Sequence, residues 1–208
     1  MLNRKVVLGL LVGLLLGGTV ATLAYSAAGG GENNSFDAAH SDLTVAGAAA
    51  FPDFSLYAVG QSFEGSALTG ITRRVEARTP PDRVRANFVG YRYGDCVVVS
   101  GEACPAPLEI QVWPACERNL SSYSLTPAGD PLPSERLTVR GVPAAFFEGG
   151  NRLEVYTGSV SIVMFGQGKP QLLRAANALS AANASASVRA DGQLPAPAAG
   201  ALEGKLAC

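Results

Sequence analysis

The chain has 208 residues, with 16 basic and 17 acidic side chains and a formal net charge of −1 at pH 7. This balance leaves no basic stripe for nucleic acid, and the length suits a single folded core. No pattern typical of a catalytic, metal or nucleotide site stands out, so the sequence predicts no cofactor and no metal.

The N-terminal segment is the most informative part of the chain. Val6 to Tyr25 is a run without a single charge, and Arg4 and Lys5 precede it. As a helix it would span about 30 Å, the thickness of the bilayer core. The positive-inside rule keeps the N-terminus in the cytoplasm. We therefore predict a single-pass transmembrane anchor at residues 1–26 of a cell-membrane protein, with an extracytoplasmic body.

Cleavage as a signal peptide remains an alternative to a retained anchor. Small residues follow the apolar run, and a peptidase could cut after Ser26 or Ala28. The length of the run exceeds that of a usual signal peptide and favours retention. The sequence leaves this choice open.

Both ends of the exported part read as linkers. Residues 27–50 are rich in Gly, Ala, Ser and Asn and predict a flexible tether, with His40 as a solvated residue inside it. Residues 184–208 form an Ala/Pro tail that ends in a cysteine. Between them, residues 51–183 are expected to form one extracytoplasmic domain.

Alternating apolar residues predict strands through most of this domain. Three strands are expected at 68–75, 83–93 and 108–113, and four shorter ones at 137–140, 144–148, 152–156 and 159–165. The four shorter strands are separated by Gly141-Val142-Pro143, Gly149-Gly150-Asn151 and Thr157-Gly158, as in an antiparallel meander. The last of them is apolar on both faces around Ile162 and Val163, so it should lie in the middle of the sheet.

A helix is expected from Pro170 to Asn183, because apolar residues recur at helical spacing and proline suits a first helical turn. A shorter helix is expected from Glu117 to Tyr123. The longer helix would cover one face of the antiparallel sheet, which predicts an α+β fold.

Four cysteines, Cys96, Cys104, Cys116 and Cys208, lie beyond the predicted anchor. In an oxidising compartment an even number favours disulfides, and four cysteines allow three pairings. Cys96 and Cys104 flank a short loop, which leaves Cys116 for Cys208. That second bond would tie the tail back, with Leu202 and Leu206 near the end of the 108–113 strand. The spacings do not suit zinc.

Residues that could carry chemistry are few. A pair of carboxylates could serve a glycosidase, although surface positions are the expected interpretation. Five aromatic residues could line a groove or fill the core, and three Asn-x-Ser/Thr sequons occur. The carboxylates are Glu64, Glu76, Asp82, Asp95, Glu109, Glu117, Glu148 and Glu154; the aromatic residues are Tyr91, Tyr93, Trp113, Phe146 and Phe147; the sequons begin at Asn33, Asn119 and Asn183.

Several motifs carry a resemblance. With the anchor, the strand end Tyr93-Gly94-Asp95-Cys96, the segment from Cys104 to Cys116 and the terminal Leu-Glu-Gly-Lys-Leu-Ala-Cys, the chain resembles uncharacterised membrane-anchored proteins of high-GC Gram-positive bacteria. The stretch from Gly141 to Leu179 is similar to strand-rich extracytoplasmic modules behind anti-sigma-type anchors. Neither resemblance implies an activity.

The sequence thus predicts a membrane-anchored domain that binds a ligand or partner, or supports the envelope, without catalysis. One alternative is a carrier or sensor of an apolar ligand, which needs a lined cavity of a few hundred Å3 beneath the Pro170 helix. A less favoured alternative is a carboxylate-pair hydrolase, which needs two carboxylates facing a cleft.

Overall fold

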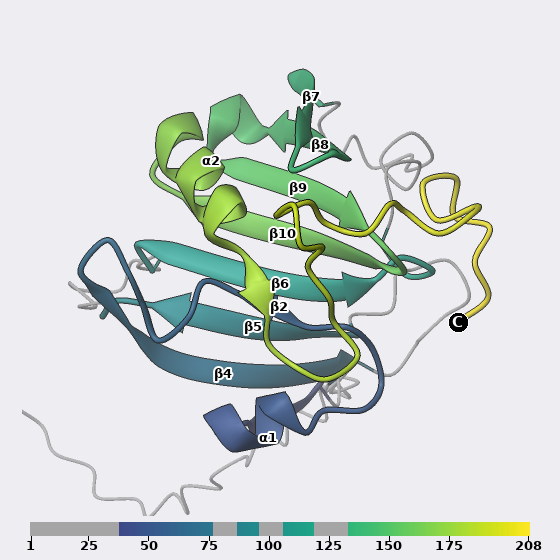
Figure 1. The fold of residues 1–208 in the computed structure, drawn as a ribbon. Coiled ribbons are helices and arrows are strands. Elements are labelled where there is room, and N and C mark those ends of the chain that lie inside the picture. The colour runs from purple at the N-terminus through teal and green to yellow at the C-terminus, as the bar shows by residue number, and fades with distance from the viewer. Residues whose placement is uncertain (1–37, 77–86, 96–105, 119–132) are drawn as a thin grey trace, which may run out of the picture. The chain divides into compact units, whose positions relative to one another are not determined.

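The computed structural model describes residues 38–76, 87–95, 106–118 and 133–208 (Figure 1). Among these residues, no helix is long and apolar enough to cross a bilayer. The anchor predicted at residues 1–26 lies outside the described part of the chain, and so do Cys96, Cys104, Asp82, Asn33 and Asn119.

The described residues form one large antiparallel sheet in the order β1-β4-β5-β6-β10-β9-β8-β7, with the short β3 paired to β4 (Figure 1). A second, two-stranded sheet pairs β2 with β11. The strands are β1 Ala38–Asp42, β2 Tyr57–Ala58, β3 Ser62–Phe63, β4 Ser66–Glu76, β5 Asn87–Tyr93, β6 Leu108–Pro114, β7 Glu135–Val139, β8 Val142–Phe147, β9 Arg152–Thr157, β10 Val160–Gly166 and β11 Ser180–Ala181. The helices are α1 Val45–Ala49 and α2 Lys169–Ala178, with a short 3-10 turn, η2, at Glu148–Gly150.

The predicted antiparallel sheet with a C-terminal helix is confirmed, and so is the central place of the last strand. β10 lies between β6 and β9, and Ile162, Val163 and Met164 on it are fully buried. One turn differs from the prediction, because β8 begins at Val142 directly opposite Val139. The connection is therefore the pair Arg140-Gly141, whose φ angles of 48° and 80° suit a tight hairpin.

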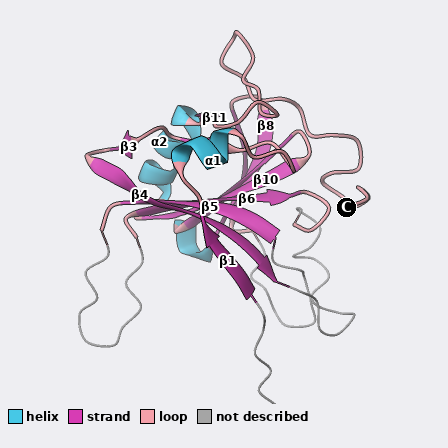
Figure 2. Cartoon of the chain, turned by 90° about the horizontal axis from the view of Figure 1, so that it is seen from below, coloured by secondary structure: helices cyan, strands magenta, loops and turns pink. Residues whose placement is uncertain are grey.

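Both helices lie on the same side of the sheet, as Figure 2 shows. The inward residues of α2 are Leu172, Ala175 and Ala176, and all three are fully buried in the main core. The helix ends at Ala178, earlier than the predicted Asn183, because Leu179 has an extended backbone and the next two residues pair with β2. The short helix predicted from Glu117 is not formed at its start, where Glu117 lies in a turn; the rest of that range is largely outside the described residues.

The tether predicted at residues 27–50 is wrong from Ala38 onward. Strand β1 pairs with β4, which places His40 opposite Arg74, and α1 follows with Ala48 in the core. The Thr44 side chain caps α1 by accepting a hydrogen bond from the Gly47 N–H at 3.0 Å. The composition of this segment did not indicate a folded structure, for two reasons. An edge strand such as β1 is held by backbone hydrogen bonds, which any residue can form. A helix as short as α1 places only one small apolar residue, Ala48, in the core.

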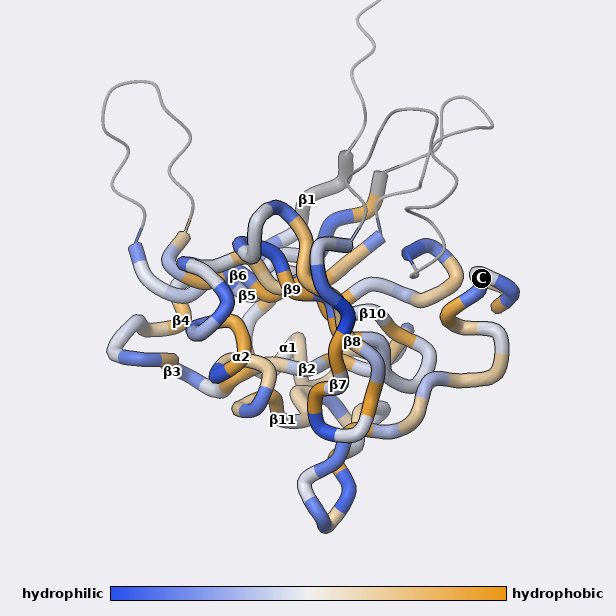
Figure 3. The backbone as a smooth tube through the Cα atoms, turned by 90° about the horizontal axis from the view of Figure 1, so that it is seen from above, coloured by the Kyte–Doolittle hydropathy of each residue, from blue (hydrophilic) through white to orange (hydrophobic). Residues whose placement is uncertain are grey.

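The tail resembles a linker in composition, but it is part of the fold and is tied back on the body, as the expected Cys116–Cys208 bond requires. Leu194 is 2% exposed and belongs to the core on the helix side, whereas Leu202 packs with Ala145, Phe147 and Tyr156 on the other side. The tail crosses the end of the sheet, where the Ala198 N–H donates to the Gly158 carbonyl at 2.7 Å. Figure 3 shows that both hydrophobic and hydrophilic positions occur along this segment. The apolar residues of the tail are irregularly spaced, so a search for helical or strand periodicity does not identify them as core residues.

Candidate functional site

A buried ionic cluster lies on the sheet face opposite the helices. Glu154 on β9 is fully buried, and the Arg118 Nη2 lies 2.6 Å from its Oε1. The Arg152 Nε lies 3.3 Å from the same oxygen, and the Tyr156 hydroxyl donates to the Oε2 at 3.1 Å. Two hydrogen bonds and a second ion pair therefore converge on one carboxylate. We call these four residues the Glu154 cluster.

The electrostatics of this cluster reflect competition between burial and pairing. Burial raises the pKa of the Glu154 carboxyl, while Arg118, Arg152 and the Tyr156 hydrogen bond pull that pKa down. Burial likewise lowers the pKa of Arg118, and the Glu154 charge opposes this effect. Burial and the Glu154 charge both raise the pKa of Tyr156, which keeps its hydroxyl protonated as a donor.

Aromatic rings hold the two guanidinium groups in place. Arg118 lies over the Trp113 ring at 5.2 Å and Arg152 over the Phe147 ring at 4.7 Å, which are cation–π distances. The Ser161 hydroxyl donates to the Arg118 carbonyl at 2.6 Å. The cluster thus holds the turn that carries Cys116 against the sheet, and each oxygen of its carboxylate accepts a hydrogen bond.

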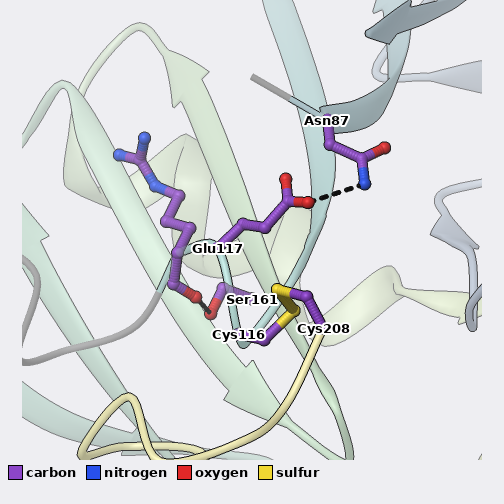
Figure 4. The surroundings of a disulfide bond; sticks show 6 residues. Asn87, Cys116, Glu117, Ser161 and Cys208 are labelled. Carbon is purple, nitrogen blue, oxygen red and sulfur yellow. Dashed lines mark hydrogen bonds between the residues drawn. A yellow bond between two sulfur atoms is a disulfide. The ribbon is translucent and has the colours of Figure 1, made fainter. Parts of the chain in front are cut away.

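Cys116 and Cys208 are joined by a disulfide, the pairing that the sequence analysis expected for these two residues (Figure 4). Their Cα atoms are 5.3 Å apart and 92 positions separate them in the chain. Beside the bond, the Asn87 amide donates to the Glu117 carboxylate at 2.9 Å. A pocket of about 280 Å3 adjoins the disulfide, and Leu206 from the tail is one of its walls. In the described ranges, no group of three or more His, Cys, Asp or Glu residues is placed to hold a metal ion.

The remaining predicted carboxylates are spread over the surface. Glu148 pairs with Arg152, so it shares that partner with Glu154. Glu64 pairs with Arg174 at an exposed position, which lowers the pKa of Glu64 through the hydrogen bond from Arg174. Asp95 is exposed, and the side chain of Glu76 lies outside the described part.

The sequon asparagine Asn183 has a structural role. It is 7% exposed, and its side chain accepts from the Leu56 N–H at 2.9 Å and donates to the carbonyls of Phe51 and Phe54 at 2.8 Å. It also accepts from the Ala186 N–H at 3.1 Å. Four hydrogen bonds fill the capacity of one amide, so Asn183 in the folded protein is not available for glycosylation.

The five predicted aromatic residues are all buried, as a core interpretation requires. Trp113 stacks on Phe88 with ring centroids 4.5 Å apart. Next to this stack, a pocket of about 120 Å3 opens on the face opposite the helices, with Gly90, Arg92 and Glu109 among its walls.

An apolar groove lies on the helix side, beneath α1 rather than α2. It has a volume of about 140 Å3 and we call it the α1 groove. Tyr91 is one of its walls; the side chain is 2% exposed, and its hydroxyl hydrogen-bonds with no described atom. The residues that line the groove are Val45, Ala48, Ala49, Ala58, Gly60, Gln61, Leu68, Ile71, Tyr91, Ser180, Ala181 and Ala182.

The sequence analysis named Tyr91 as a possible groove residue, and Tyr91 lines the α1 groove. The α1 side of the groove was hidden because residues 45–49 were assigned to the tether. The Glu154 cluster was also missed, because nothing in the sequence brings Arg118 to β9. Comparison of the chain with models of known families, with curated proteins and with solved structures finds no match.

Proposed function

We propose that this chain is a membrane-anchored, extracytoplasmic domain that binds a ligand or partner and has no catalytic activity of its own. The observation that carries the proposal is the Cys116–Cys208 disulfide. Disulfides persist in oxidising compartments outside the cytoplasm, and this one closes almost the whole C-terminal half of the chain. The uncharged run Val6 to Tyr25 supplies the proposed anchor.

The arrangement of Glu154 supports binding over catalysis. A general acid or nucleophile must reach its substrate, whereas the Glu154 carboxylate is fully buried, accepts hydrogen bonds from Arg118 and Tyr156, and forms an ion pair with Arg152. Its neighbour Glu148 points to an exposed position, where its side chain is 45% accessible. Two carboxylates in such different environments do not flank a common cleft, which makes the carboxylate-pair hydrolase the weaker alternative.

Cell fractionation of the full-length protein tests location. We expect the chain to stay in carbonate-washed membranes and its cysteines to resist a membrane-impermeant maleimide until a reductant is added. Leu15→Arg places a charge in the middle of the run, which costs about 2.5–3.5 kcal/mol of insertion free energy, and should abolish retention. Leu15→Val is the matched control and should behave as the wild type. A soluble product that begins near Ala27 or Gly29 would disprove the anchor.

A carrier or sensor of an apolar ligand is the second candidate, and the α1 groove favours it. Beneath α2, where this function was expected to need a cavity, the side chains of Leu172, Ala175 and Ala176 are fully buried. The α1 groove is instead built from small apolar side chains, and Val45 on α1 is 49% exposed. If this candidate is correct, the purified chain should bind a small apolar molecule in a saturable manner.

A further inference from the structure

Strand β7 forms one edge of the large sheet, and β8 is its partner within the described residues (Figure 1). We infer that this edge pairs with β7 of a second copy of the chain, antiparallel across a two-fold axis at Leu137, so that one sheet runs through a homodimer. This pairing depends on the folded body and not on the proposed membrane anchor.

The register of the β7–β8 hairpin shows which backbone groups of β7 point outward. Val139 and Val142 flank the two-residue turn, so they form a hydrogen-bonded pair, and such pairs alternate with non-hydrogen-bonded ones. Thr138 therefore does not bond to Pro143 opposite it, which has no N–H to donate, and Arg136 is in the same class as Thr138. The N–H and C=O groups of these two residues point away from β8, and none of them has a hydrogen-bond partner in the described residues.

The side chains of β7 leave this edge open to another strand. Arg136 and Thr138 are exposed, and Leu137 is only partly buried where it packs against the main core. Outward-pointing backbone groups on an edge strand are a template for an added strand. A strand placed beside β7 would satisfy these groups and cover the exposed part of Leu137.

The positions of the arginines select one register for two copies. With Leu137 on the axis, Arg136 lies opposite Thr138 of the second copy, so each outward N–H of one copy meets an outward C=O of the other. An axis at Arg136 would place this side chain opposite its own copy, and an axis at Thr138 would place it opposite Arg140. Like charges directly opposite each other are destabilising, so the register at Leu137 is favoured.

The acidic residue of the strand also fits this register. Glu135 pairs with Lys169 at 2.5 Å and would lie opposite Val139 of the second copy, so the pairing brings no two carboxylates together. Two strands of five residues bury less than the roughly 1,200 Å2 of a stable interface. We therefore expect a weak dimer in dilute solution and a more populated one where the copies are held at high local concentration.

Disulfide trapping of the full-length chain in proteoliposomes tests this pairing. Leu137→Cys places a sulfur at the axis, where the two Cα atoms of a non-hydrogen-bonded pair would be about 4.5 Å apart, within the range of disulfides. We expect mild oxidation to convert this variant into a covalent dimer on a non-reducing gel. Arg189→Cys is the matched control, because the Arg189 side chain is 62% exposed on the tail, and it should stay monomeric, as should the wild type.

Proline at position 138 tests the backbone pairing separately. Thr138→Pro, added to Leu137→Cys, removes an outward N–H that the described fold does not use, and should slow dimer formation at least about tenfold. Thr138→Val keeps the N–H and should react as Leu137→Cys alone does. An unchanged Tm would show that Thr138→Pro is folded; if the Tm falls, the two charge variants below decide.

Charge at position 138 tests the register without changing the backbone. Thr138→Arg places an arginine opposite Arg136 of the second copy and should slow dimer formation by Leu137→Cys. Thr138→Glu places a carboxylate at the same point and should speed it. Both effects should shrink at high salt, because the two side chains are exposed.

Three results would overturn the inference: no more dimer from Leu137→Cys than from Arg189→Cys, an unchanged rate in a folded Thr138→Pro chain, or rates that change in the same direction in Thr138→Arg and Thr138→Glu. A product in native membranes that joins Leu137→Cys to a different protein, without a dimer in proteoliposomes, would assign the edge to that protein instead. Trapping detects contact between copies, whereas fractionation tests only the location, so failure of one is distinct from failure of the other.

Discussion

The two faces of the large sheet are covered by different kinds of interaction. On the helix side, Leu153 and Val155 of β9 pack into a continuous apolar core with Leu172 of α2. On the opposite side, the same strand buries Arg152, Glu154 and Tyr156. The apolar face gains free energy from every buried group, whereas an ionic face gains only if each charge keeps its partners. The second face should therefore be the one most easily disrupted by a single substitution.

Removal of the Glu154 carboxylate should give the largest effect. Glu154→Ala leaves Arg118 and Arg152 without their shared buried partner, and we expect a loss of about 3–5 kcal/mol in the free energy of unfolding, measured in urea. Glu148→Ala is the matched control, because Glu148 contacts the same Arg152 from an exposed position and should cost less than about 1 kcal/mol. Equal losses in the two variants would show that burial of the charge does not set its importance.

The disulfide joins the end of the tail at Cys208 to the turn at Cys116. Its removal should have the next largest effect on the free energy of unfolding. Cys208→Ser opens a loop of 92 positions and should lower the free energy of unfolding by about 2–4 kcal/mol. Reduction of the wild type should reproduce most of this loss. The two treatments should also make Cys116 reactive to a thiol reagent. A Cys116 that remains unreactive in Cys208→Ser would mean that another partner protects it.

The apolar face was largely predictable from the sequence and the charged face was not. Alternation located most of the strands, and the apolar positions of Pro170 to Ala178 located α2. The segment Arg152-Leu-Glu-Val-Tyr alternates as a half-exposed strand would, yet both of its sides are buried. Burial of the second side depends on Arg118 and on the tail, whose contacts with β9 are distant in sequence and leave no local pattern.

The tail contacts both faces of the sheet. Substitution of one leucine on each face therefore compares how much each face contributes to stability. Leu194 packs into the apolar core and Leu202 packs beside Tyr156 on the other side. We expect Leu194→Ala to cost about 2–3 kcal/mol, the low end for a buried leucine because the tail can partly collapse into the space. Leu202 is only partly buried, and Leu202→Ala should cost about 1 kcal/mol. Thermal and urea unfolding would measure both, and a larger loss at Leu202 would reverse the assigned roles.

The pH dependence of stability should give the smallest but most specific difference between the faces. Burial raises the pKa of Glu154 above its usual value of 4.5. The folded state then keeps the Glu154 proton to a higher pH than the unfolded state does. The stability due to this shift is fully present below the unfolded pKa and is lost as the pH rises through the folded pKa.

A difference measurement isolates this contribution from the other carboxylates. The free energy of unfolding of the wild type, minus that of Glu154→Gln, should fall as the pH rises above about 4.5 and then level off above the folded pKa. Leu153→Ala is the control on the opposite face of the same strand; it removes a fully buried apolar side chain, so its loss should be the same at every pH. A difference for Glu154 that instead grows with pH would show that Arg118 and Arg152 outweigh burial. In that case the ion pairs of Glu154 would make a net favourable contribution to the free energy of unfolding, larger than the cost of burying the charge.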